Sequence, residues 1–167
     1  MPGGERGFSR LELAVVAVVW AVLFGVLLER LTYYQEAAEQ ARFESELQVF
    51  KTGLQLRLAE LIAANREREA RSLETENPVR WLDKPPASYA GEYPARPEPG
   101  AWYYDSTARE LVYVPNQDRF LVVDDRRRPA QLRFRVQLRF QPVDAPGGRV
   151  KGVAGISLDP GSPFRWL

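Results

Sequence analysis

The most conspicuous polar side chain of this sequence is a carboxylate at the edge of a long apolar run. Glu12 comes just before residues 13–28, LAVVAVVWAVLFGVLL, in which no side chain is charged or strongly polar. A carboxylate at the edge of a membrane span costs about 2–3 kcal/mol on insertion scales unless it is paired. Two interpretations follow. Glu12 lies among lipid headgroups without a role, or it requires a positively charged partner.

A second candidate site is a series of arginines at alternate positions. In residues 131–141, QLRFRVQLRFQ, strict alternation predicts a strand with Arg133, Arg135 and Arg139 on its wet face. Residues 126–128 add three more arginines nearby. Such a face can bind DNA, anionic lipid or an acidic partner. Because arginine supplies twenty of the 23 basic side chains, we favour a solvated strand face over a binding site.

Two residue types are missing, and their absence narrows the possible chemistry. The chain contains no Cys and no His, which excludes disulfides, Cys nucleophiles and every His-based triad. Six aspartates fall in expected turns, where Asp is common in any case. They are Asp105, Asp118, Asp124, Asp125, Asp144 and Asp159. Neither an EF-hand pattern nor a glycine-rich phosphate loop occurs, so we expect no metal, no cofactor and no enzymatic activity.

The formal charge of +1 hides three unlike parts. Residues 1–28 are neutral, residues 29–76 carry a net charge of −3, and residues 77–167 carry +4. A near-zero total argues against a strongly basic nucleic-acid binder. The division also indicates where the chain changes character.

The apolar run is long enough to approach the thickness of a bilayer core. Sixteen helical residues rise about 24 Å, against a hydrocarbon thickness of about 30 Å. A buried core helix is disfavoured because the remaining chain is too small to enclose it. A cleaved secretory signal is disfavoured because no small-x-small site follows Leu28. We therefore expect a retained membrane anchor that continues as a helix.

The residues around Glu12 form a motif. The segment Gly7-Phe8-Ser9-Arg10-Leu11-Glu12, which abuts the apolar run, resembles the class III signal of the type IV pilin and pseudopilin family. The resemblance covers about the first 35 residues in detail. Major pilins usually carry a Pro in this helix, whereas this chain has Glu29 at that place. That difference favours a pseudopilin or a minor pilin.

The resemblance implies how the protein is processed and where it acts. Prepilin peptidase would cut between Gly7 and Phe8, and the new amine of Phe8 would be N-methylated. Glu12 would pair with the N-terminal amine of a neighbouring subunit. Arg6 and Arg10 would stay on the cytoplasmic side of the bacterial inner membrane, with the C-terminal part in the periplasm. Implied partners are other pilin or pseudopilin subunits and the inner-membrane assembly platform.

Beyond the membrane, residues 29–72 are predicted to continue the helix. They contain no Pro and one Gly, Gly53, and they are rich in Glu, Gln, Ala, Leu and Arg. Apolar residues recur at spacings of three and four along one stripe. The stripe comprises Phe43, Leu47, Phe50, Leu54, Leu58 and Leu61, and Leu56 and Ile62 would broaden it. It can pack on a sheet or form a coiled coil, and we favour the sheet.

The C-terminal part carries β signals. Six prolines interleaved with aromatic residues in 77–99 predict an ordered loop packed on the domain. Short strands are expected at 101–104, 110–114, 119–123, 131–141 and 150–158. The predicted fold class is α+β and pilin-like, with the long helix packed on an antiparallel sheet of four or five strands. The predicted parts are a leader at 1–7, an anchor helix at 8–31, its periplasmic continuation at 32–76, the loop at 77–99 and the β domain at 100–167.

The function expected from these features is that of a pilin-like structural subunit. It would belong to a type II secretion pseudopilus or a type IV pilus, as a pseudopilin or minor pilin. The alternative is a single-span, membrane-anchored periplasmic binding module. In that case the arginine face would bind DNA or another anionic ligand.

Overall fold

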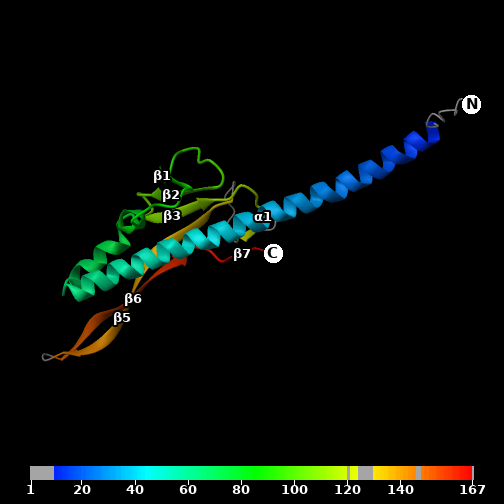
Figure 1. Cartoon of the computed structure of the whole chain (residues 1–167). Helices are drawn as coiled ribbons and strands as arrows, with labels where there is room; N and C mark the ends of the chain where they lie inside the picture. Colours follow the sequence, from blue (N-terminus) through cyan, green and yellow to red (C-terminus); the bar gives the residue numbers. More distant parts are fainter. Residues whose placement is uncertain (1–9, 120, 124–129, 146–147, 167) are drawn as a thin grey trace, which may run out of the picture. The chain divides into compact units, whose positions relative to one another are not determined.

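The computed structural model describes residues 10–119, 121–123, 130–145 and 148–166. The chain divides into two compact units, of which the first ends at Ala38 and the second begins at Glu39. Figure 1 shows the order of the elements along the chain.

Helix α1 runs from Arg10 to Ala63, over 54 residues. Its first part, in the N-terminal unit, is the apolar run. The helix is shorter than expected at its C-terminal end, since residues 32–76 were predicted to be helical throughout. After Ala63 the residues Glu67–Glu74 form a 3-10 helix, η1, and Pro78–Trp81 form a second, η2.

A left-handed residue ends α1. Asn65 has φ of +56°, and its N–H donates to Ile62 O over 3.0 Å. The N–H of Arg66 donates to Leu61 O over 2.7 Å. This pair of bonds is the Schellman motif, which satisfies the last carbonyls of a helix, and Asn is among the few residues that accept the left-handed conformation. The left-handed conformation of Asn65 therefore explains why α1 ends earlier than the sequence predicts.

The main sheet of the described chain has five strands in the order β1-β2-β3-β5-β6. They are β1 (Tyr89–Glu92), β2 (Ala101–Asp105), β3 (Glu110–Val114), β5 (Leu132–Ala145) and β6 (Gly148–Pro160). Strands β2, β3, β5 and β6 pair antiparallel, as expected. The predicted strand at 131–141 is confirmed as the first part of β5.

Two features of the structure differ from the single antiparallel sheet that the sequence predicts. Strand β1 lies inside the Pro-rich segment and pairs parallel to β2, which makes the sheet mixed. Strand β4, Leu121–Val123, does not join this sheet. It pairs instead with β7, Phe164–Trp166, near the end of the chain. Both pairings join segments that no local pattern relates.

The core of the second unit lies between α1 and one face of the sheet. All six residues of the predicted helical stripe are buried, which confirms that it packs on a sheet. Leu56 and Ile62 do not broaden it, because they are 59% and 40% exposed. Phe43 stacks on Trp102 with ring centroids 5.3 Å apart and an angle of 7° between the planes. Aromatic rings from α1, β3, β5 and β7 surround this pair.

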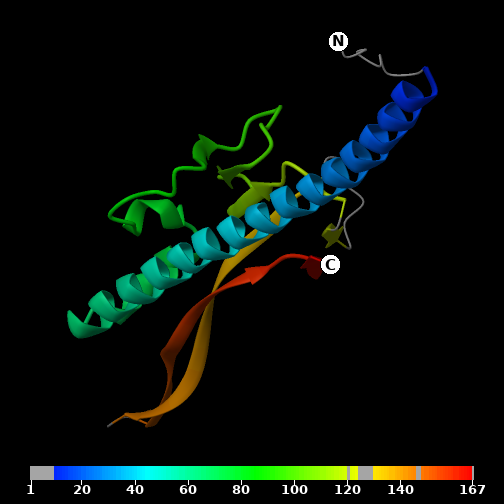
Figure 2. The same cartoon turned by 45° about the vertical axis from the view of Figure 1, so that its right-hand side comes forward.

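Strands β5 and β6 continue as a long hairpin beyond the part that β3 covers (Figure 2). Strand β3 pairs with β5 only from Leu132 to Phe134, whereas β6 pairs with β5 as far as Ala145. Val136, Leu138, Ile156 and Leu158 are buried in the near part of the hairpin. Farther along β5, Phe140 is 43% exposed.

Candidate functional site

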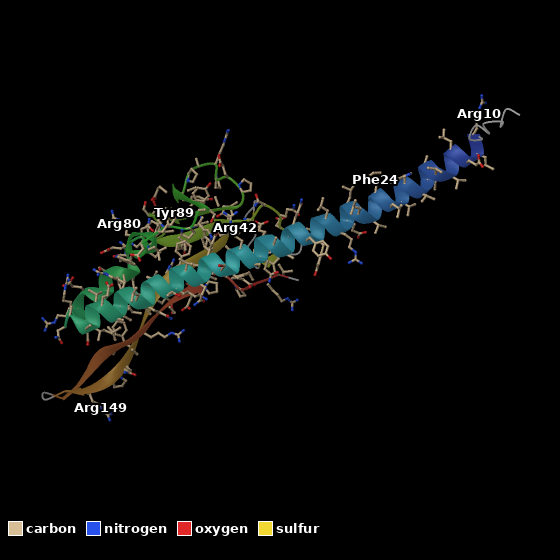
Figure 3. All side chains as sticks on the ribbon, viewed as in Figure 1. Arg10, Phe24, Arg42, Arg80, Tyr89 and Arg149 are labelled. Atoms are coloured by element: carbon tan, nitrogen blue, oxygen red, sulfur yellow. The ribbon has the colours of Figure 1, made fainter. Side chains whose placement is uncertain are left out.

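The first part of α1 presents apolar side chains all round the helix. Every large apolar side chain of residues 11–31 is 44–75% exposed, from Val16 at the lower end to Leu11 at the upper. Phe24 projects from the helix in Figure 3, and its ring lies 5.5 Å from that of Trp20. The segment is long and apolar enough to cross a membrane. In water, exposure of so much apolar surface is unfavourable, so the segment needs lipid or partner chains around it.

The predicted processing and assembly residues lie at the beginning of this segment. Gly7 and Phe8 fall outside the described residues. Glu12 lies in the first turn of α1 and is exposed, as is Arg10. A carboxylate is favourable in a first helical turn because it interacts with the unpaired N–H groups and the positive end of the helix dipole.

The arginine face of β5 is not a uniform cationic surface. Arg133 lies opposite Val112 of β3, and its side chain is only 15% exposed. Its Nη1 is 3.1 Å from both Asp105 Oδ2 and Glu110 Oε2. Its Nε and Nη2 donate to Gln131 Oε1 over 3.2 and 3.1 Å. The guanidinium group thus uses its donors within the protein.

The charges in this cluster stabilise one another. Burial by itself lowers the pKa of Arg133, but the hydrogen bonds to Glu110 and Asp105 outweigh it and hold the pKa above its usual value. For Asp105 the effect of burial has the opposite sign, because burial disfavours the charged carboxylate and by itself raises the pKa. The backbone N–H of Ala108 and the Arg133 guanidinium more than offset that effect, so this pKa lies below its usual value. Arg133, Asp105 and Glu110 therefore form an ion-pair network within the protein.

The other two arginines are more accessible. The Arg135 side chain is 56% exposed, and its Nη2 lies 2.8 Å from Glu110 Oε1. Arg139 is exposed and lies opposite Gly155 of β6. Glu110 therefore pairs with two of the three predicted residues, which reduces the positive charge available to an external anion. The arginines at 126–128 lie outside the described residues.

Sequence reasoning missed a set of carboxylates that fasten α1 to the sheet. Glu46 Oε2 accepts from Trp102 Nε1 over 2.8 Å and from Ser88 Oγ over 2.5 Å. Arg42 Nε donates to its other oxygen over 3.1 Å. The available signal was the spacing, since Glu39 and Glu46 lie seven residues apart and flank Phe43 on the stripe.

Glu39 makes the second contact of this kind. Its Oε1 accepts from Tyr113 Oη over 2.9 Å and from the backbone N–H of Asn116 over 2.6 Å. Burial, followed by the hydrogen bond to Glu39, raises the pKa of Tyr113 far above its usual value. These bonds set the register of the helix on the sheet.

No group of three or more Asp, Glu, His or Cys in the described ranges is arranged to hold an ion. Their carboxylates instead accept hydrogen bonds from arginines, tyrosine, tryptophan and backbone N–H groups. These carboxylates therefore join different segments of the fold to one another.

A scan of protein-family models, a search of curated proteins and a search of solved structures each found no match to this chain. The architecture is nevertheless pilin-like. A single N-terminal helix is apolar in its first part, and its second part packs on a sheet. The protein is thus an α+β protein, and the described part of its chain contains one candidate membrane span.

Proposed function

We propose that this chain is a pilin-like structural subunit, a pseudopilin or minor pilin, that prepilin peptidase processes and that assembles into a filament. The observation that carries the proposal is the continuity of α1. One helix supplies an uncovered apolar segment and then the stripe that buries itself on the sheet. Such a helix suits a subunit that is stored in a membrane and later surrounded by the helices of other subunits.

Glu12 supports the proposal because it places a carboxylate at the beginning of the apolar segment, where a cation of a neighbouring subunit can pair with it. A free N-terminal amine created at Phe8 of a neighbouring subunit would supply one. The pair would neutralise two charges in a setting where each alone is costly. In this proposal Gly7 and Phe8 serve processing, Phe8 and Glu12 serve assembly, and no residue is catalytic.

Intact-mass and N-terminal peptide mass spectrometry test the processing step. The full chain is expressed in cells with active prepilin peptidase and extracted from membranes. We expect a mature N-terminus at methylated Phe8. Gly7→Ala should block cleavage, whereas Gly4→Ala, a matched change in the same leader, should not. Retention of Met1 in the presence of the active peptidase would contradict the proposal.

Filament assembly tests the role of Glu12. Glu12→Gln should still insert into the membrane and be cleaved, but should reduce incorporation into sheared filaments about tenfold or more. Glu29→Gln removes a carboxylate at the other end of the span and serves as the control. Equal incorporation of the two variants would rule out the assembly role of Glu12.

The alternative, a membrane-anchored module that binds DNA or another anion, receives less support. Arg133 is committed to Asp105 and Glu110, and Arg135 is paired with Glu110. Carboxylates neutralise two of the three arginines on this strand face, so it offers little positive charge for binding a polyanion such as DNA.

A further inference from the structure

Strand β6 forms the last edge of the five-stranded sheet. It pairs with β5 from Pro160, opposite Phe134, to Gly148, opposite Ala145. Within the described chain no strand pairs with its other edge. After β6 the chain turns back towards β5, since the N–H of Gly161 donates to Arg133 O over 2.8 Å. A free edge of this length presents a row of backbone donors and acceptors.

Small residues leave the backbone of this edge accessible. Gly152, Ala154, Gly155 and Ser157 occupy the middle of the strand. A Cβ added at Gly155 would meet no atom within 4 Å. Ala154 is an extra residue, because Arg139 lies opposite Gly155 and Phe140 opposite Val153. This irregularity divides the edge, and residues 155–160 form the part nearer the core.

A groove of about 250 Å³ runs beside residues 156–159, between β6 and α1. Lys51, Leu54 and Gln55 line it from the helix, and Arg139 lines it from β5. Successive side chains of a strand point to opposite faces of its sheet. A strand added to residues 155–160 would therefore direct alternate side chains into this groove.

The charges near the edge are mainly positive. Lys51 and Arg139 border the groove, and among the described residues neither has a carboxylate within ion-pair distance. Arg149 and Lys151 follow on the far part of β6, where Figure 3 labels Arg149. Asp159, the carboxylate of the groove, accepts from Ser157 Oγ over 2.9 Å. Acidic side chains complement this surface.

We propose that the outer edge of β6 binds an acidic polypeptide segment of another protein in extended conformation, as an added strand. The backbone groups of β6 supply main-chain hydrogen bonds, and Lys51 and Arg139 select acidic side chains. The partner is a different protein because residues 77–167, which supply the strands of a second copy, carry a net charge of +4 and would be repelled by this surface. This surface is separate from the apolar segment of α1 and does not depend on filament assembly.

Fluorescence anisotropy with defined peptides tests the proposal, using the full chain in non-ionic detergent. The probe is a labelled nonapeptide of alternating Val and Glu, and its counterpart alternates Val and Lys. We expect the acidic peptide to bind and the basic one not to bind. The double variant Lys51→Gln/Arg139→Gln should weaken binding about tenfold. Arg80→Gln, which removes an exposed charge from η2, should leave it unchanged.

A second measurement separates strand addition from attraction of charge alone. The acidic peptide is N-methylated either at all its Val or at all its Glu residues. An added strand uses alternate N–H groups, so one version should lose binding and the other should retain it. Equal binding of both versions, or equally tight binding of a nine-nucleotide oligothymidylate, would overturn the proposal. Failure of the acidic peptide to bind would overturn it as well, and would leave the filament role unaffected.

Discussion

Glu46 of α1 accepts a hydrogen bond from the indole Nε1 of Trp102 over 2.8 Å, across 56 residues of sequence. Trp102 is fully buried, and its ring stacks on Phe43, one turn before Glu46 on the same helix. One tryptophan is therefore held by an aromatic contact on its face and by a carboxylate at its polar edge. This contact aligns the helix with β2.

Removal of this carboxylate should destabilise the folded domain. Glu46→Ala leaves the buried Trp102 N–H and Ser88 hydroxyl without their acceptor, at a cost of about 2 kcal/mol in the free energy of unfolding. Urea unfolding followed by tryptophan fluorescence measures it. Glu44→Ala removes an exposed glutamate that accepts from Gln40, and its effect should stay within about 0.5 kcal/mol. Equal losses would show that Glu46 adds no more to stability than an exposed glutamate does.

The aromatic centre should dominate the stability of the domain. Phe43 is 1% exposed and contacts five other aromatic rings. Phe43→Ala should lower the free energy of unfolding by about 4 kcal/mol, because it removes buried apolar area and leaves a cavity. Phe140→Ala, on the exposed part of β5, should cost less than about 1 kcal/mol. A small effect at Phe43 would mean that the helix is not packed on the sheet as described.

Two arginines of the same strand should behave differently. Arg133→Ala leaves Asp105 without its cation and beside Glu110, which keeps only Arg135, and we expect a loss of about 2 kcal/mol. Arg139→Ala should change stability by less than about 0.5 kcal/mol. Calorimetric melting of both variants checks the difference. Similar melting temperatures for both variants would contradict the assignment of Arg133 to an internal network.

Tyr113 should make stability fall at high pH. Its pKa is raised in the folded state by burial and by Glu39, so the folded protein keeps a proton that the unfolded chain loses above about pH 10. The stabilisation is therefore complete below about pH 10 and is lost as pH rises beyond it. The free energy of unfolding, measured from pH 8 to 11, should decline less steeply in Tyr113→Phe. The exposed Tyr34→Phe should follow the unchanged protein, and parallel curves for all three would refute the prediction.

Much of the fold follows from local patterns in the sequence. The apolar run at 13–28, the stripe from Phe43 to Leu61 and the alternation at 131–141 each repeat with the period of one element. A period identifies the buried face of a helix or strand without knowledge of its partner. The helix, its packing on a sheet and the face of β5 that is buried could therefore be predicted, and all three are confirmed.

The tertiary structure decided the contacts between segments that are distant in sequence. The parallel pairing of β1, the pairing of β4 with β7 and the shortening of α1 at Asn65 were not predicted. Arg133 has the same pattern as Arg139 in the sequence, yet only Arg133 lies beside Asp105 and Glu110. Periodicity states which face a residue occupies, whereas its charge environment depends on which strands become neighbours. That choice is made by the packing of the whole domain.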